Sequence, residues 1–93
     1  MEVGYGVVYA EVVVTDDIPQ LPKAIRMRVR VAIERKLMTA PETFGKPLRR
    51  SLRGYRKMRV GDYRVIFRIE QKQVKVFGIQ HRRVVYDIAN KRL

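Results

Sequence analysis

From Tyr55 onward, polar and apolar side chains alternate with a period of two, which is the pattern of β-strands with one buried face. The dipeptide Gly61-Asp62 interrupts the alternation and is a typical two-residue hairpin turn. A second short turn is expected at Gln71-Lys72. The alternation therefore predicts three consecutive antiparallel strands, at about residues 55–60, 63–70 and 73–82.

The N-terminal half predicts a strand followed by helices. Residues 5–14 are rich in β-branched and aromatic side chains, which favours a strand. Residues 16–21 predict a turn or a single helical turn, and Pro22 is expected at the first position of the next helix. Apolar residues at helical spacing predict that this helix covers residues 23–38. Its apolar stripe consists of Ile25, Val29, Ala32, Ile33 and Leu37.

The remaining segments complete an α+β fold. Residues 40–54 contain prolines and glycines and predict a connecting loop, whereas residues 84–93 fit either a last strand or a short helix. A chain of 93 residues has room for one core, so residues 1–93 are expected to form a single domain. Its predicted order is β-α-α-β-β-β, with the N-terminal strand and two helices packed on one face of a small, mostly antiparallel sheet.

The charge of the chain favours a polyanionic partner. Lys and Arg number 21 and Asp and Glu 9, so the formal charge is +12, and between residues 46 and 68 the only acid is Asp62. The lack of cysteine and the single histidine argue against a disulfide scaffold, a thiolate or multi-histidine metal site and a cysteine nucleophile. Apolar runs are too short to span a membrane, and Met1-Glu2-Val3 does not start like a signal peptide, so a cytoplasmic location is expected.

The hairpin register gathers basic residues on one face of the sheet. If Gly61-Asp62 is the turn, Arg59 lies opposite Arg64, and Lys57 shares their face. Like charges directly opposed across two strands are destabilising, so this arrangement is typical of a preorganised anion site. The alternative is a solvated sheet face whose charges are screened by water and salt.

The second turn extends this face to the histidine. A turn at Gln71-Lys72 predicts that Arg64 pairs with Ile79 and that Asp62 pairs with His81. His81 then joins the face of Lys57, Arg59 and Arg64. Because the apolar side chains of these strands belong beneath the helices, the basic face is expected to look outward.

The central motif resembles a known family. Residues 48–67, LRRSLRGYRKMRVGDYRVIF, and residues 81–86, HRRVVY, resemble the RelE/ParE toxin superfamily, and the N-terminal strand and helices fit the same plan. The resemblance implies the toxin of a type II toxin–antitoxin pair. RelE-type members cut mRNA in the ribosomal A site without a metal or other cofactor, whereas ParE-type members share the fold and inhibit DNA gyrase.

The resemblance also implies which side chains act. The functional positions of RelE-type members correspond here to Lys57, Arg59, Arg64, Arg82 with its neighbours His81 and Arg83, and Tyr86. Two departures concern Arg59, where some members have lysine, and the stretch before Tyr86, where the spacing varies between members. Further arginines are expected to bind RNA: Arg49, Arg53, Arg56, Arg68 and Arg83.

The expected reaction is attack of an RNA 2′-hydroxyl on the adjacent phosphorus. Arg64 and Arg82 suit the stabilisation of the phosphorane because a guanidinium binds two phosphate oxygens and stays charged. The general base is either His81, whose residue type titrates near neutral pH, or Lys57, beside cationic neighbours that favour its neutral form. Tyr86 either stacks on a base, donates a proton or packs in the core.

The expected partners are mRNA on the ribosome, rRNA and an acidic cognate antitoxin that covers the basic face or shifts the C-terminal segment. No membrane partner is expected. Two alternatives stay open, a ParE-like gyrase inhibitor and a catalytically inactive module that binds RNA or its antitoxin.

Overall fold

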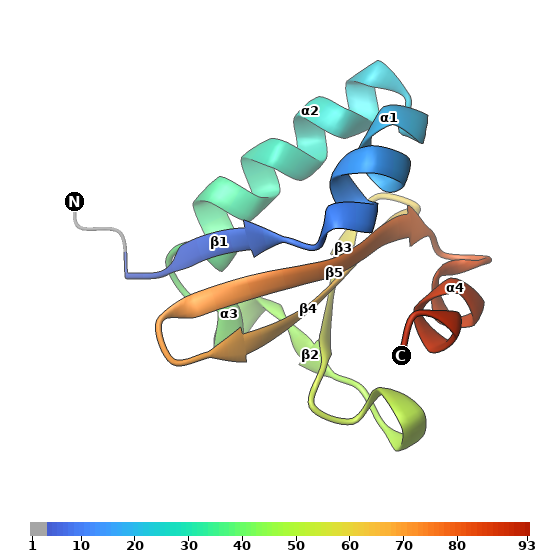
Figure 1. The fold of residues 1–93 in the computed structure, drawn as a ribbon. Helices are drawn as coiled ribbons and strands as arrows, with labels where there is room; N and C mark the ends of the chain where they lie inside the picture. Colours follow the sequence, from blue (N-terminus) through green and yellow to red (C-terminus); the bar gives the residue numbers. More distant parts are fainter. Residues whose placement is uncertain (1–3) are drawn as a thin grey trace.

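A five-stranded sheet forms the centre of residues 4–93, the part of the chain that the computed structural model describes (Figure 1). Its strand order is β1-β5-β4-β3-β2, with β1 parallel to β5 and every other pair antiparallel. The prediction about Met1-Glu2-Val3 lies outside the described residues. The strands are β1 (Gly6–Tyr9), β2 (Lys46–Pro47), β3 (Arg56–Val60), β4 (Tyr63–Glu70) and β5 (Gln73–His81).

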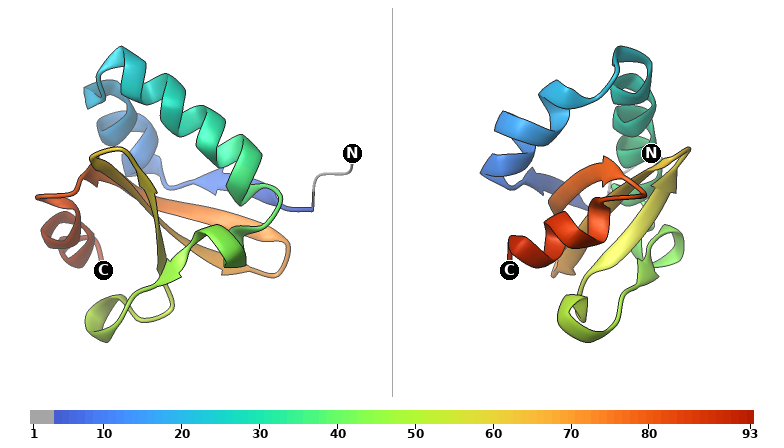
Figure 2. Two further views of the ribbon diagram at one scale, coloured as in Figure 1. Left: turned by 180° about the vertical axis from the view of Figure 1, so that it is seen from behind. Right: turned by 90° about the vertical axis from the view of Figure 1, so that its right-hand side faces the viewer.

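Helices cover both faces of this sheet (Figure 2). The helical segments within residues 11–37 lie on one face, and α4 (Val85–Lys91), at the C-terminal end, lies on the other. The α+β class and the mostly antiparallel sheet are thus confirmed. Of the two alternatives for residues 84–93, a last strand or a short helix, the structure has the helix. The helical segments are η1 (Val13–Asp17), α1 (Ile18–Gln20), α2 (Lys23–Ala32), η2 (Ile33–Leu37), α3 (Pro41–Phe44), η3 (Arg50–Leu52) and α4 (Val85–Lys91).

The predicted strand over residues 5–14 is wrong in its second half. β1 ends at Tyr9, and the chain is helical from Glu11 through the π-helical turn η1. The buried positions explain the change, because Val13, Asp17 and Leu21 are spaced four residues apart and all lie inside. Burial of this helical stripe outweighs the strand preference of the valines, since β-propensity depends strongly on context.

The helix predicted over residues 23–38 is confirmed as α2 followed by the π-helical turn η2. Pro22 is its N-cap, one position earlier than expected. Residues 40–54 are not a plain loop, because they contain α3, β2 and η3. The apolar stripe of the helix packs into the main core together with Phe67, which is fully buried. No helix within residues 4–93 is long and apolar enough to cross a membrane.

The hairpin around Gly61-Asp62 has the predicted register, with Arg59 opposite Arg64 and Lys57 opposite Ile66. The second hairpin keeps its predicted register from the turn to Phe67, including Arg68 opposite Lys75, and loses it beyond that point. Ile66 pairs with Gly78 but Phe67 pairs with Val76, so one residue of β5 is bulged out. Beyond the bulge every pairing moves by one residue.

This shift corrects the prediction for the histidine. Arg64 pairs with Gln80 rather than Ile79, and His81 pairs with Tyr63 rather than Asp62. Directly opposed residues share a face, so His81 lies on the face of Tyr63, away from Lys57 and Arg64.

The basic face is also less open than predicted. Ile66 alternates with Val65 and Phe67 and therefore points away from the main core, yet it is fully buried. The helix α4 contacts β5 and η3 on that side. Its side chains Val85 and Ala89 are buried at a spacing of one helical turn. A second small apolar layer therefore fixes α4 on the face that carries Lys57.

Candidate nucleic-acid interface and catalytic site

The folded-back helix α4 brings Tyr86 into contact with Lys57. The Lys57 ammonium donates a hydrogen bond to the Tyr86 hydroxyl at 3.0 Å, and its nitrogen lies 5.6 Å from the centre of the Tyr86 ring. Both side chains are half-buried. The hydrogen bond holds the ammonium nitrogen and the phenol oxygen side by side on this face of the sheet.

Arg64 is held in place beside the hairpin turn. Its Nη1 donates to the carbonyl oxygens of Gly61 at 3.0 Å and Tyr63 at 2.9 Å. Gly61 has a φ of +59°, which glycine adopts without the steric cost paid by other residues. The turn therefore orients one side of the guanidinium, and the remaining N–H groups stay available to an anion.

Arg59, opposite Arg64, is exposed and lines a groove between α2 and β3. Cations of α2 and η2 line the same groove, and the sequence analysis gave them no functional role. A β-carbon on Gly61 would lie 3.1 Å from Nη1 of Arg28, so this arginine lies close to the hairpin turn. The groove receives three cations from the helix: Arg28, Arg35 and Lys36. Arg35 and Lys36 follow Arg28 by seven and eight residues, a spacing that places all three on one helix face. This spacing was the sequence signal from which their common position could have been predicted.

The basic residues after β5 lie around the same turn. The Arg82 backbone N–H donates to the Asp62 carbonyl at 2.8 Å, and its Nε lies 3.9 Å from an Asp62 carboxylate oxygen. Both side chains are more than half exposed, so this ion pair is weak. The His81 ring stands edge-on to Tyr63 at 5.4 Å, and its Nδ1 accepts the Arg83 backbone N–H at 3.2 Å. His81 therefore makes local contacts, whereas Arg82 lies beside the hairpin turn.

The other arginines predicted to bind RNA fall into two groups. Arg56 donates to the carbonyl oxygens of Gly45 and Glu42, and it points to the face opposite Lys57. Arg68 pairs with Glu70 at 2.6 Å and covers the Tyr55 ring at 5.7 Å. The exposed members, whose side chains are open to solvent, are Arg49, Arg53 and Arg83.

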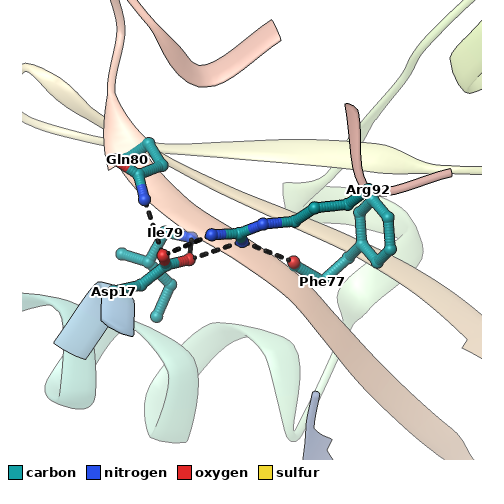
Figure 3. Close-up of polar contacts among 5 residues, drawn as sticks. All are labelled: Asp17, Phe77, Ile79, Gln80 and Arg92. Carbon is teal, nitrogen blue, oxygen red and sulfur yellow. Dashed lines mark hydrogen bonds and ion pairs between the residues drawn. The ribbon is translucent and has the colours of Figure 1, made fainter. Parts of the chain in front are cut away.

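A buried ion pair that the sequence analysis missed links Asp17 of η1 to Arg92 at the end of α4 (Figure 3). Both Asp17 carboxylate oxygens accept hydrogen bonds from Arg92, at 2.8 and 2.7 Å. The hydrogen bond to Asp17 raises the pKa of the Arg92 guanidinium above its usual value. A separation of 75 residues gives no local pattern from which this pair could be read.

The family of the chain follows from comparison with known proteins. Residues 13–86 match the family described as the ParE toxin of the type II toxin–antitoxin system parDE. The toxin RelE of Mycobacterium tuberculosis is 33% identical over 72 residues, which span 75% of this chain and 74% of that protein. This chain belongs to the RelE/ParE family of type II toxins.

Solved structures of the family share the fold. The RelBE2 toxin–antitoxin complex of M. tuberculosis matches with a TM-score of 0.78 and 31% identity, over 87% of this chain and 94% of that chain. A free-state mutant of the Escherichia coli toxin RelE matches with a TM-score of 0.66 and 17% identity, over 97% and 98% of the two chains. The second match bears on the fold alone.

Proposed function

We propose that this RelE/ParE-family chain is an endoribonuclease that cuts mRNA in the ribosomal A site and is neutralised by a cognate antitoxin. The observation that carries the proposal is the Lys57–Tyr86 hydrogen bond of 3.0 Å on the sheet face that also holds Arg64. This face offers a cation–phenol pair for proton transfer and an oriented guanidinium for a phosphate, which are the groups that RNA cleavage requires.

In the proposed reaction, the 2′-oxygen forms a bond to the adjacent phosphorus while the bond from phosphorus to the 5′-oxygen breaks. Arg64 and Arg82 bind the non-bridging oxygens, whose charge grows in the phosphorane. Lys57, in its neutral form, takes the proton of the 2′-hydroxyl, and the Tyr86 phenol gives its proton to the departing 5′-oxygen. Transfer of a proton from Lys57 back to Tyr86 across their hydrogen bond restores the pair. The products are a 2′,3′-cyclic phosphate and a 5′-hydroxyl.

The ribosome supplies what this site lacks. The carboxylate of the turn residue Asp62 pairs loosely with Arg82. Because the proton-transfer pair of Lys57 and Tyr86 contains no carboxylate, the chain is expected to act slowly on free RNA and faster once the A site orients the mRNA. The net charge of +12 supports association with rRNA, with a strong dependence on salt.

The proposed antitoxin partner is supported by the relatives. The matched M. tuberculosis structure, at 31% identity, is a toxin–antitoxin complex. An acidic segment that orders on the basic face would block Arg64 or displace α4. A cognate antitoxin that abolishes cleavage while Arg64 and Tyr86 stay accessible to solvent would contradict direct occlusion.

A gyrase-inhibiting function is the second candidate, because the matching family description names ParE. One experiment separates the two candidates. The purified chain is added to ribosomes stalled on a defined mRNA, new 5′ ends are mapped by primer extension, and gyrase supercoiling is measured in parallel. We expect a cut within the A-site codon, and we expect this cleavage to persist at EDTA concentrations that leave the ribosomes intact. The cleavage should be lost in Arg64→Ala.

Two results would contradict the proposal. Inhibition of supercoiling without mRNA cleavage would favour the ParE-like function. Absence of both activities, with tight binding to RNA or to the antitoxin, would favour the catalytically inactive binding module.

A further inference from the structure

Asp17 is the one buried charged residue within residues 4–93, and its carboxylate is fully occupied. Besides the two bonds from Arg92, it accepts the Ile79 backbone N–H at 2.9 Å and the Gln80 side-chain amide at 2.6 Å (Figure 3). Each oxygen thus accepts two hydrogen bonds. A buried carboxylate bound by a guanidinium fork and two further donors has a strongly defined geometry.

This pair replaces a missing strand at the edge of the sheet. β1 stops pairing with β5 at Val76, so the outer edge of β5 is open from Phe77 onward. Arg92 donates to the Phe77 carbonyl at 3.2 Å, and Asp17 takes the Ile79 N–H. Between them lies Gly78, where a β-carbon would be 3.4 Å from Arg92 Nη1. The Phe77 carbonyl and the Ile79 N–H, which have no strand partner on this edge of β5, are therefore bound by Arg92 and Asp17.

The pair joins the two helical layers. Asp17 belongs to η1 on one face of the sheet, and Arg92 is the C-cap of α4 on the other. The other contacts of α4 include the apolar packing of Val85 and Ala89 and the hydrogen bonds of Asn90 with Ser51 and of Tyr86 with Lys57. Apolar contacts are non-directional, so they allow a short helix to slide or rotate. A bidentate ion pair fixes both movements.

The opposite end of α4 carries Tyr86, six residues before Arg92 and about 9 Å away along the helix axis. Because α4 has only seven residues, fixing the position of its C-terminal end also fixes the position of its first turn. We propose that Asp17 and Arg92 are a positioning pair that sets the Tyr86 hydroxyl against Lys57. This inference deepens the proposed ribonuclease function and rests on it for the effect on cleavage.

The variants that test the pair are Arg92→Gln, which removes the charge and the fork, and Arg92→Lys, which keeps the charge and removes the fork. The control is Lys91→Gln, which removes the exposed cation next to Arg92 on the same helix. Circular dichroism establishes folding. Tyrosine labelled with carbon-13 makes the ring signals visible by NMR, and the signal that disappears in Tyr86→Phe is assigned to Tyr86. Lys57→Met then gives the reference position of the Tyr86 signal when the lysine is absent.

We expect the Tyr86 signal of folded Arg92→Gln to move toward its position in Lys57→Met, with a fall in A-site cleavage of about 10- to 100-fold. The Tyr86 signal of Arg92→Lys is expected to lie between those of Arg92→Gln and the wild type. The signal of Lys91→Gln is expected at the wild-type position. If Arg92→Gln does not fold, Arg92→Lys is judged by the same criterion.

An unchanged Tyr86 signal in the folded Arg92 variants would overturn the proposal, whether or not cleavage falls. The NMR readout does not depend on activity. A wild-type chain that fails to cut mRNA, but whose Tyr86 signal still moves in Arg92→Gln, would refute the proposed function and leave the positioning role standing.

Discussion

The Lys57 ammonium on β3 and the Tyr86 hydroxyl on α4 meet at 3.0 Å, although 29 residues separate them in the sequence. The contact forms because α4 folds back over the sheet face that carries Lys57. It is the point at which the central hairpin motif and the C-terminal motif of the sequence come together.

Tyr86→Phe tests this contact most simply, because phenylalanine keeps the ring near Lys57 and removes only the hydroxyl. Positioned acid–base groups contribute about 10²–10⁴-fold to a rate, so we expect single-turnover cleavage on ribosomes to fall by at least about 10²-fold. The stability should change by no more than about 1 kcal/mol in thermal unfolding. Tyr63→Phe, on the opposite face, is the matched control. Equal losses in both variants would contradict a specific role for the Tyr86 hydroxyl.

Arg64→Lys tests the fork geometry. Lysine keeps the charge but cannot both bind the carbonyl oxygens of Gly61 and Tyr63 and present two parallel donors to a phosphate. We expect cleavage to fall by about 10- to 100-fold, since one bidentate contact contributes about 1–3 kcal/mol. Arg30→Lys, which changes an exposed arginine paired with Glu34 on α2, should leave the rate unchanged. A fully active Arg64→Lys would show that charge alone suffices at this position.

Glu70 gives a prediction for pH dependence. The hydrogen bond from Lys75, and then the charges of Arg68 and Lys75, lower the pKa of the Glu70 carboxyl below its usual value. Because the folded-state pKa is lowered, the ion pairs of Glu70 stabilise the fold above the usual glutamate range and cease to do so as the pH falls through the lowered value.

An NMR titration of the Glu70 carboxyl should therefore have its midpoint below 4.5, the ordinary value, and the midpoint should rise in Lys75→Met. Arg68→Met should raise it less, since the hydrogen bond from Lys75 is the largest contribution. The residue is exposed, so added salt should weaken the effect. A midpoint at the ordinary value in the wild type would mean that these ion pairs do not persist in solution.

Substitution of Gly45 should lower the stability of the fold without altering the candidate site. A β-carbon at this position would overlap the Phe67 ring and lie 3.0 Å from the Pro41 carbonyl oxygen. Overpacking of this kind costs about 1–3 kcal/mol, so Gly45→Ala should lower the midpoint of urea unfolding accordingly. Gly6→Ala, where a β-carbon meets nothing within 4 Å, should change stability by less than about 0.5 kcal/mol. Matching midpoints for the two variants would contradict the close packing of Phe67.

Local patterns predicted the central hairpin well. The turn at Gly61-Asp62, the pairing of Arg59 with Arg64 and the helix after Pro22 all depend on neighbours in sequence, and all are found in the structure. The strand register follows directly from a two-residue turn, because such a turn leaves one alignment of the flanking strands.

Features that depend on distant residues were not predictable. The bulge in β5 coincides with the stretch where Phe77 stacks near Tyr55 at 4.8 Å, and it moves His81 to the other face. The strand-forming valines after Tyr9 fold as a helix because Val13 and Asp17 bury together. The partner of Asp17 is Arg92, at the other end of the chain. The spacing of Val13 and Asp17 is local, but the contact that allows a charged side chain to be buried there is made with Arg92, 75 residues away.

The central claim is that the face of Lys57, Arg64 and Tyr86 cuts mRNA by attack of the RNA's own 2′-hydroxyl. Ribosomes programmed with mRNA that carries one 2′-deoxynucleotide in the A-site codon test it most directly, with the all-ribose mRNA as the reference. We predict a cut in the all-ribose mRNA that leaves a 5′-hydroxyl, and an intact bond after the deoxynucleotide. Cleavage of both mRNAs at that bond, or of neither, would contradict it.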